Sequence, residues 1–160
     1  MSSISYTIVE SLVGDLIIYG TESCLMGVGF LHARDWTKER ETWVEQPEAF
    51  REIMGQLQGY FSGTLKRFEM PISLSGTEFQ QSVYRQLINI PYGETRSYSD
   101  IAEAIGNKKA VRAVGNANSK NPIAIVVPCH RVIGQDGSLT GFAGGIEAKK
   151  ILLRLENAAS

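Results

Sequence analysis

Three short apolar-rich segments stand at the start of the chain, over residues 6–9, 15–19 and 25–30, and more polar residues separate them. β-Branched and aromatic side chains are frequent in these segments, and Gly14 and Gly20 lie between them. This composition with glycine-marked turns is typical of short strands joined in sequence order. We therefore expect an antiparallel meander at the N-terminus.

From residue 48 to residue 61 the apolar positions recur at helical spacing. They are Phe50, Ile53, Met54, Leu57, Tyr60 and Phe61. Pro47 precedes this segment and Gly63 follows it, as is usual at the two ends of a helix. We expect a helix over residues 48–61 whose apolar stripe packs on the sheet, followed by a further strand over residues 68–72.

The second half of the chain is patterned mainly for helices. Thr77, with Gln80 three residues later, forms a capping pattern ahead of an apolar face over residues 79–88. A last helix is expected over residues 146–157, after a hairpin turn at residues 136–137.

A helix-turn-helix is expected between these two helices. Ser97 can cap a short helix over residues 98–104, and Gly106 allows a tight corner before a second helix over residues 110–118. Small side chains surround Arg112 in that second helix. Such a surface either packs closely on a neighbouring helix or approaches a DNA groove with the arginine projecting, and the spacing alone leaves both open.

These elements together predict an α+β fold. An N-terminal antiparallel sheet with a helix is followed by a mainly helical C-terminal lobe that contains a helix-turn-helix. We expect the boundary after residue 75, with an N-terminal lobe over residues 1–75 and a C-terminal domain over residues 76–160.

The composition, 43% hydrophobic and 21% charged, is ordinary for a soluble globular protein. No run approaches the roughly 18 apolar residues that span a bilayer, and the first residues lack the pattern of a signal peptide. We expect a cytoplasmic protein without a membrane partner. The chain has two cysteines and two histidines, and a structural zinc site would use all four, which argues against a bound metal.

The net charge of −1 conceals a difference between the two halves. Residues 1–75 carry 6 basic and 10 acidic side chains, whereas residues 76–160 carry 10 basic and 7 acidic ones. The basic side chains are densest over residues 96–131, which include Arg131. A patch of this kind can meet phosphates; the alternative is an ordinary solvated face.

Cys129 and His130 lie in the segment PCHRV, directly after the apolar run 123–127, which is patterned as a buried strand. A cysteine is nucleophilic only as the thiolate, and a neighbouring imidazole can take its proton near neutral pH. The alternative is a packed thiol beside a satisfied histidine. Glu156, near the end of the last helix, would orient His130 if it were buried; the alternative is a surface glutamate.

Four blocks of sequence carry a resemblance to a known family. They are IPYGETRSYS at 90–99, AVRAVG at 110–115, NPIAIVVPCHRVI at 121–133 and TGFAGG at 140–145. Together they resemble the O6-alkylguanine-DNA alkyltransferases, the methylated-DNA-protein-cysteine methyltransferases. The resemblance implies single-turnover DNA repair, in which an alkyl group moves from O6-alkylguanine, or O4-alkylthymine, in duplex DNA to a cysteine. Residues 1–75 have the length and order of the family's N-terminal lobe but no diagnostic motif.

The resemblance gives a role to each matching residue around the thiol. Cys129 would be the alkyl acceptor, and His130 the base that reaches it through a water. Glu156 would hold the imidazole, and Asn121 would pin the turns around the active-site segment. A water-mediated contact suits side chains that are adjacent on an extended segment, because they point apart.

The resemblance also implies that Tyr98 and Arg112 rotate the damaged nucleotide out of the duplex, with Arg112 filling the vacated place. The flipped base would enter a pocket lined by Tyr98, Val132, Phe142, Ala143 and Gly144. The carbonyls of Cys129 and Val132 and the N–H of Ala143 would face the guanine edge. No metal or organic cofactor is implied. The partner would be double-stranded DNA carrying O6-alkylguanine, bound by a monomer whose cooperativity on DNA is left open.

Three other functions compete with repair. Alkyltransferase-like proteins bind alkylated DNA without repairing it, but they carry tryptophan where this chain has Cys129. A Cys-His hydrolase would turn over repeatedly. A plain helix-turn-helix regulator would use Cys129 only for packing.

Overall fold

Three consecutive strands open the chain in a computed structural model that describes residues 3–157. They are β1 (Ser5–Val9), β2 (Leu16–Gly20) and β3 (Leu25–Phe30), each antiparallel to the next, so the expected meander is confirmed. A fourth strand, β4 (Val44–Glu45), pairs in parallel with β1 and completes the order β3-β2-β1-β4. The hydrophobic pattern does not predict β4, because two residues are too few to show an alternation.

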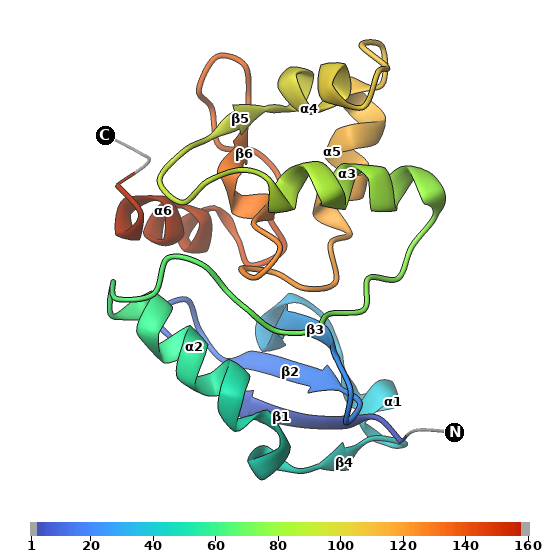
Figure 1. Cartoon of the computed structure of the whole chain (residues 1–160), viewed down its shortest axis with the longest axis vertical. Coiled ribbons are helices and arrows are strands. Elements are labelled where there is room, and N and C mark those ends of the chain that lie inside the picture. Colours follow the sequence, from blue (N-terminus) through green and yellow to red (C-terminus); the bar gives the residue numbers. More distant parts are fainter. Residues whose placement is uncertain (1–2, 158–160) are drawn as a thin grey trace.

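Alternate residues of the sheet belong to two separate apolar clusters, as the period of a strand requires. Leu16 and Ile18 pack in the cluster that includes helix α2 (Arg51–Phe61), which covers one face of the sheet (Figure 1). Ile17, between them, packs with Trp36 in the second cluster. The apolar stripe of α2 therefore lies on the sheet, as expected.

Short helical turns connect the N-terminal elements. These are η1 (Leu31–Ala33), α1 (Thr37–Arg40) and η2 (Pro47–Phe50). The turn η2 runs directly into α2, so the segment predicted as one helix from residue 48 starts as a 3-10 turn.

The strand expected over residues 68–72 is wrong. Ile72 forms only an isolated bridge with Leu25, supported by hydrogen bonds from Leu25 N–H to the Pro71 carbonyl and from Ser73 N–H to the Leu25 carbonyl. Pro71 has no N–H to donate, which limits the pairing of this segment.

The first two helices of the C-terminal half begin at capping boxes. Helix α3 (Glu78–Ile88) starts after Thr77, whose hydroxyl accepts from the Gln80 N–H while the Gln80 side chain accepts from the Thr77 N–H. Helix α4 (Tyr98–Ala104) starts in the same way after Ser97. Both starting points agree with the sequence pattern.

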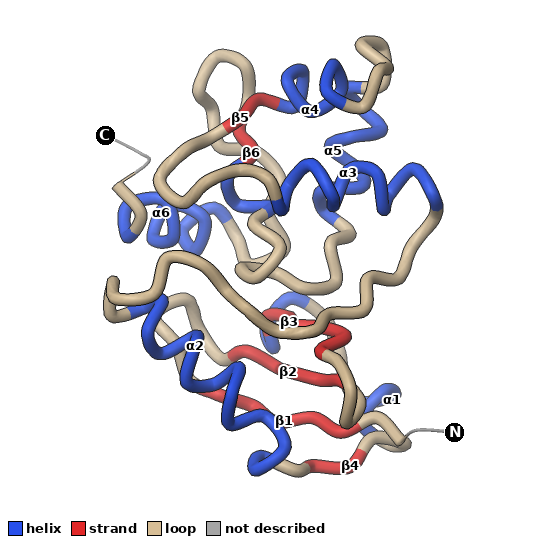
Figure 2. Tube along the Cα trace, viewed as in Figure 1, coloured by secondary structure: helices blue, strands red, loops and turns tan. Residues whose placement is uncertain are grey.

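Helix α5 (Val111–Ser119) follows α4 through a corner at Gly106, where φ is +81° and glycine is favoured. Helices α4 and α5 give the expected helix, turn and helix. Helix α6 (Ile146–Leu155) is the last helix of residues 3–157 and stops two residues before the predicted end. The α+β fold is thus confirmed, with the sheet and α2 in one lobe and α3 to α6 in the other (Figures 1 and 2).

The turn at Asp136 and Gly137 forms, but it does not join two strands of a hairpin. Strand β6 (Val132–Ile133) pairs in parallel with β5 (Arg96–Ser97). After the turn, the carbonyl of Thr140 accepts side-chain hydrogen bonds instead of backbone ones. The predicted turn is confirmed, since the Gly134 N–H donates to the Ser138 carbonyl across it at 2.8 Å, but no second strand follows it within residues 3–157.

The apolar run 123–127 is nearly all buried, but it is not a regular strand. The N–H of Val28 on β3 donates to the Pro122 carbonyl, and the N–H of Ala124 donates back to the Val28 carbonyl, both at 3.0 Å. Ile125 then turns the chain with φ +73°, an uncommon value for a β-branched residue. The edge of the N-terminal sheet thus holds the segment that leads to Cys129.

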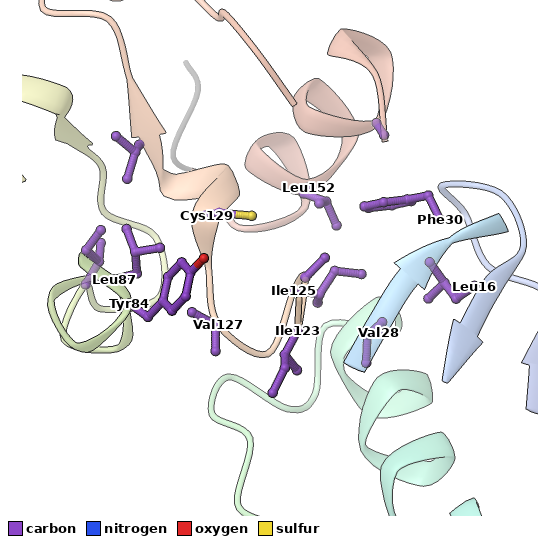
Figure 3. Packing of buried hydrophobic residues seen from close by; sticks show 14 of the residues in the cluster. Leu16, Val28, Phe30, Tyr84, Leu87, Ile123, Ile125, Val127, Cys129 and Leu152 are labelled. Carbon is purple, nitrogen blue, oxygen red and sulfur yellow. The ribbon is translucent and has the colours of Figure 1, made fainter. Parts of the chain in front are cut away.

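Apolar side chains from both lobes meet in one cluster (Figure 3). Val28 and Phe30 on β3 contribute from the first lobe, and Ile125 and Leu152 contribute from the second. The proposed boundary after residue 75 lies in the connection between α2 and α3. Within residues 3–157, no helix is both long enough and apolar enough to cross a membrane.

Candidate active site

Cys129 is the first residue of a 3-10 turn, η3 (Cys129–Arg131), and only 5% of its surface is exposed. The turn corrects the expectation of an extended segment at this point. Burial raises the pKa of the thiol, while a hydrogen bond from the Asn121 side chain and the charge of Lys149 lower it less strongly. The resting thiol is therefore protonated at neutral pH and needs a base before it can act as a nucleophile.

His130 is buried and tied to Glu156, with 2.8 Å between Nε2 of the imidazole and Oε2 of the carboxylate. Burial lowers the pKa of His130, against the attraction of the Glu156 charge, so the imidazole is neutral at neutral pH. A neutral imidazole facing a carboxylate places its one proton on that side. Nδ1 is then a bare acceptor, and it has no hydrogen-bond partner within residues 3–157.

Glu156 is buried, which settles the choice between an internal and a surface glutamate. Its carboxylate accepts from Arg131 at Nε and Nη2, from the Tyr60 hydroxyl and from the Gly93 N–H as well as facing His130. Burial raises the pKa of this carboxyl, but the hydrogen bonds from His130, Arg131 and Tyr60 outweigh it and lower the pKa to about 2. The group is a permanent anion behind the imidazole.

The expectation that Arg131 belongs to the basic surface patch is wrong, because this side chain is buried. It is 7% exposed, and its guanidinium also donates to the carbonyl of Ile90 at 2.7 Å. The basic surface consists instead of the exposed side chains Lys108, Lys109, Arg112 and Lys120, around α5 and the corner before it.

Asn121 braces the turn ahead of the thiol. Its side-chain N–H₂ donates to the Val127 carbonyl at 2.7 Å, and its Oδ1 accepts from the N–H of Ile123 at 3.0 Å. The Cys129 carbonyl accepts from Asn118 on α5 at 3.3 Å. The N–H of Val132 donates to the same oxygen, so both lone pairs of the Cys129 carbonyl are engaged by the turn and by α5.

Lys149 is a site residue that the sequence reasoning did not single out. It is fully buried, and its ammonium donates to the carbonyls of Val132 at 2.6 Å and Thr140 at 3.2 Å. Burial lowers its pKa to about 8, against the pull of the Cys129 thiolate. One signal was available, because Lys149 shares a helical stripe with Leu152 and Glu156 at spacings of three and seven.

Tyr98, the first residue of α4, lies between the two helices and the loop after β6. Its hydroxyl donates to the Thr140 carbonyl at 3.1 Å, and its ring faces Gly115 on α5. Arg112 is exposed near the start of α5. The structure thus holds Tyr98 against the chain at Thr140 and leaves Arg112 exposed on α5.

The loop over residues 141–145 is supported by the N-terminal lobe. The ring of Phe142 meets that of Phe30 edge to face at 5.3 Å, and His32 Nε2 donates to the Gly144 carbonyl at 3.1 Å. A Cβ added at Gly144 would lie 2.7 Å from the Phe30 ring. Ala143 is exposed on this loop, and Val132, the first residue of β6, is buried.

The candidate site is therefore a buried thiol with a base, an anion and a cation around it, beside a helix-turn-helix with an exposed basic surface. Such a set can deprotonate the thiol and direct it at an electrophilic carbon. Among residues 3–157, no group of three or more Cys, His, Asp or Glu side chains could hold a metal ion.

Two family profiles match this chain. Residues 78–158 match the DNA binding domain of 6-O-methylguanine DNA methyltransferase, and residues 4–74 match the ribonuclease-like domain of the same family. The methylated-DNA–protein-cysteine methyltransferase of Methanosarcina acetivorans is 51% identical over 153 residues, which are 96% of this chain and 98% of the relative.

Solved structures agree with these matches. The O6-methylguanine methyltransferase of Mycobacterium tuberculosis superposes with a TM-score of 0.91 and 46% identity, over 98% of this chain and 94% of that one. The structure of M. tuberculosis OGT in complex with DNA has a TM-score of 0.90 and 47% identity over the same shares.

Proposed function

This chain belongs to the 6-O-methylguanine DNA methyltransferase family, and from that premise we propose that it moves the alkyl group of O6-alkylguanine in duplex DNA to its own Cys129. It is a DNA-repair enzyme of the methylated-DNA–protein-cysteine methyltransferase type. The observation that carries the assignment to Cys129 is the buried thiol beside a neutral His130, whose Nε2 faces Glu156 and whose Nδ1 is unpartnered within residues 3–157.

Deprotonation of the thiol is the first chemical step. Nδ1 of His130 takes the Sγ proton through one water, and the fixed charge of Glu156 stabilises the imidazolium that results. The ammonium of Lys149 favours the thiolate at the same moment. The site thus offsets the burial that otherwise keeps Cys129 protonated.

Alkyl transfer then follows as an in-line displacement. Sγ bonds to the alkyl carbon as the bond from that carbon to guanine O6 breaks, and the bonding electron pair stays on O6. The proton taken by His130 returns to the guanine, so the products are an S-alkylcysteine and a neutral guanine. A thioether is a stable product at neutral pH, so each molecule reacts once.

Access to the thiol requires the base to leave the duplex, because its reactive atom is otherwise inside the stack. We assign Arg112 to fill the space that the base vacates and Tyr98 to contact the flipped nucleotide. Two observations support this assignment: Tyr98 lies between Gly115 on α5 and Thr140, next to the 141–145 loop, and Arg112 is exposed on α5. Val132, Phe142, Ala143 and Gly144 would complete the pocket.

The assembly and the location in the cell are further parts of the proposal. We expect a cytoplasmic monomer on DNA, since the thiol, its base and the basic surface all come from one chain. Sedimentation of the protein alone and with a short duplex would check the stoichiometry.

The competing functions predict other outcomes of one experiment. The protein is mixed with duplex DNA that contains O6-methylguanine and is then weighed intact and after digestion. We expect one added methyl group on Cys129, in an amount limited by the protein. An unchanged mass with repeated turnover would indicate a hydrolase, and binding without transfer would indicate a lesion-binding protein or regulator.

The two cysteines provide a matched pair of variants. Cys129→Ser should abolish methyl transfer while DNA affinity stays, because only the nucleophile is removed. Cys24→Ser, whose thiol lies in the N-terminal lobe, should react as the wild type does. Transfer by Cys129→Ser, or its loss in Cys24→Ser, would contradict the assignment.

A further inference from the structure

One side chain of the N-terminal lobe enters the buried polar cluster around His130. Tyr60 is in the last turn of α2 and has no exposed surface. Its hydroxyl donates to Oε2 of Glu156, the same oxygen that faces Nε2 of His130. In Figures 1 and 2 the C-terminal end of α2 approaches α6, the helix that leads to Glu156.

The hydroxyl of Tyr60 donates its hydrogen bond to Glu156 and not to His130. Burial raises the pKa of Tyr60, and the charge of Glu156 raises it further, so the hydroxyl stays protonated. Its one proton is used toward Glu156, and a lone pair is therefore left toward Nε2 of His130, 3.4 Å away. A lone pair at that position is compatible with a proton on Nε2 and unfavourable for a bare Nε2.

The carboxylate of Glu156 is held from several sides. Arg131 donates to both of its oxygens, at 2.8 Å and 3.0 Å, and Tyr60 completes the coordination of Oε2. A group with two acceptor oxygens and all donors in place has little freedom to rotate. The orientation of the imidazole that depends on it is correspondingly defined.

We propose that Tyr60 is a positioning residue for alkyl transfer: its hydroxyl fixes the Glu156 carboxylate against His130 and keeps Nδ1 bare, so the N-terminal lobe completes the proton-accepting cluster. This inference rests on the proposed function. It gives the N-terminal lobe a direct part in the reaction, in addition to its packing. The sequence offered no hint of it, since Tyr60 reads as one more member of the apolar stripe of α2.

Tyr60→Phe tests the proposal, because phenylalanine keeps the ring and removes only the hydroxyl. Tyr92→Phe is the matched control: the Tyr92 ring packs 6.2 Å from that of Tyr60, but its hydroxyl donates to the Leu155 carbonyl instead of a carboxylate. Single-turnover transfer is measured across pH for both variants, with an O6-methylguanine duplex and with free O6-benzylguanine.

We expect Tyr60→Phe to slow transfer about tenfold, which is the lower end of the loss seen when a hydrogen-bonding partner behind a metal-ligating histidine is removed. The factor should be the same for both substrates, because both depend on the same base, and duplex affinity should be unchanged. The acid limb of the rate profile should move to higher pH, since a carboxylate with one donor fewer attracts a proton onto His130 more strongly. Tyr92→Phe should match the wild type in all respects.

Several titratable and charged groups face His130 and act on the pH profile. They are Glu156 and Lys149 at the C-terminal helix, Arg131 and Cys129 on η3, Tyr60 on α2, and Tyr92 before β5. Only Tyr60 and Tyr92 differ between the variants and the wild type.

A wild-type rate and acid limb in Tyr60→Phe would overturn the proposal, and so would equal effects of the two substitutions. Nuclear magnetic resonance of the wild type gives a second measurement that does not depend on the variant folding. It should show a slowly exchanging Tyr60 hydroxyl proton close to the Nε2 proton of His130. Absence of this pair, or a proton on Nδ1, would also overturn it.

The two proposals can fail separately. If the wild type forms no S-alkylcysteine, the proposed function is wrong, whereas the spectrum still reports on the Tyr60 hydrogen bond. If the wild type reacts and Tyr60→Phe reacts equally well, the function stands and the role of Tyr60 does not.

Discussion

Glu156 is the residue on which the buried polar groups of this protein converge. Hydrogen bonds from His130, Arg131 and Tyr60 outweigh the effect of burial and lower its pKa from 4.5 to about 2. A carboxyl that is more acidic in the folded state stabilises that state wherever it is ionised. The same contacts that orient the catalytic base therefore also contribute to the stability of the fold.

This gives a prediction for acid unfolding. The contribution of Glu156 is complete above about pH 4.5 and is lost as the pH falls toward 2, because the folded-state pKa is the lower one. We expect Glu156→Gln to remove a pH-dependent contribution of about 2–3 kcal/mol in that window. Urea unfolding between pH 7 and pH 2.5 measures it.

The exposed Glu103→Gln is the control for that experiment, and its stability should follow the wild-type curve. If the free energies of unfolding of Glu156→Gln and the wild type ran parallel between pH 5 and pH 2, the coupling of this carboxyl to the fold would be refuted.

Single residues also show where reasoning from the sequence succeeded and where it failed. The pairing of His130 with Glu156 was expected, because motif and position both pointed to it. Arg131 was misplaced on the surface, since a charged residue is exposed unless it has a partner, and that partner is 25 positions away. Lys149 was overlooked because the carbonyls that bind its ammonium, those of Val132 and Thr140, are also distant in the sequence.

Helices were the elements most readily predicted. The capping boxes at Thr77 and Ser97 each involve only four neighbouring residues, so the sequence alone predicts where these two helices begin. Elements that depend on distant partners were missed: β4 needs β1 to exist, and the 136–137 turn lacks the second strand that its local pattern suggested.

The helix α5 carries the prediction for base flipping. Arg112→Ala should lower the transfer rate from duplex DNA by at least about tenfold, because flipping costs a few kcal/mol of stacking that the arginine offsets. Reaction with free O6-benzylguanine should be nearly unchanged, since a free base needs no flipping. Single-turnover assays on both substrates give the comparison.

Lys120→Ala removes an exposed cation at the other end of α5 and serves as the reference. It should weaken DNA binding modestly at low salt and leave the rate at saturating DNA unaltered. Equal losses of Arg112→Ala on the duplex and the free base would refute the flipping role.

At the scale of the whole molecule, the two lobes build the site jointly. Val28 on β3 forms backbone hydrogen bonds with residues 122–124. Phe30 and His32 contact the 141–145 loop, and the Tyr60 hydroxyl donates to Glu156. The reactive thiol thus lies in the C-terminal lobe, while much of its surroundings is held in place by the other lobe.

Gly144→Ala should expose this dependence. Its Cβ would meet the Phe30 ring at 2.7 Å, so the 141–145 loop must shift. We expect a stability loss of about 1–3 kcal/mol and a tenfold to hundredfold slower reaction with O6-benzylguanine, of the order seen when a pocket moves by about 1 Å. Thermal unfolding and single-turnover kinetics check the two effects.

Gly55→Ala, on the exposed side of α2 with nothing within 4 Å, is the control. It should raise stability by about 0.5–1 kcal/mol through helix propensity and leave the rate as it is. A Gly144→Ala protein that reacts at the wild-type rate would show that the loop does not shape the pocket.

The sequence by itself determined the local elements and the chemistry of the reactive segment. Strand-forming segments between glycine-marked turns, helix caps and the four family blocks are all patterns of neighbouring residues, so the order of the chain is enough to recognise them. Only the tertiary structure decided which buried charges are paired and which lobe supports which part of the site. The contact of Tyr60 with Glu156, 96 positions apart, depends on how α2 packs against the end of α6. The sequence patterns of these two helices do not show that packing.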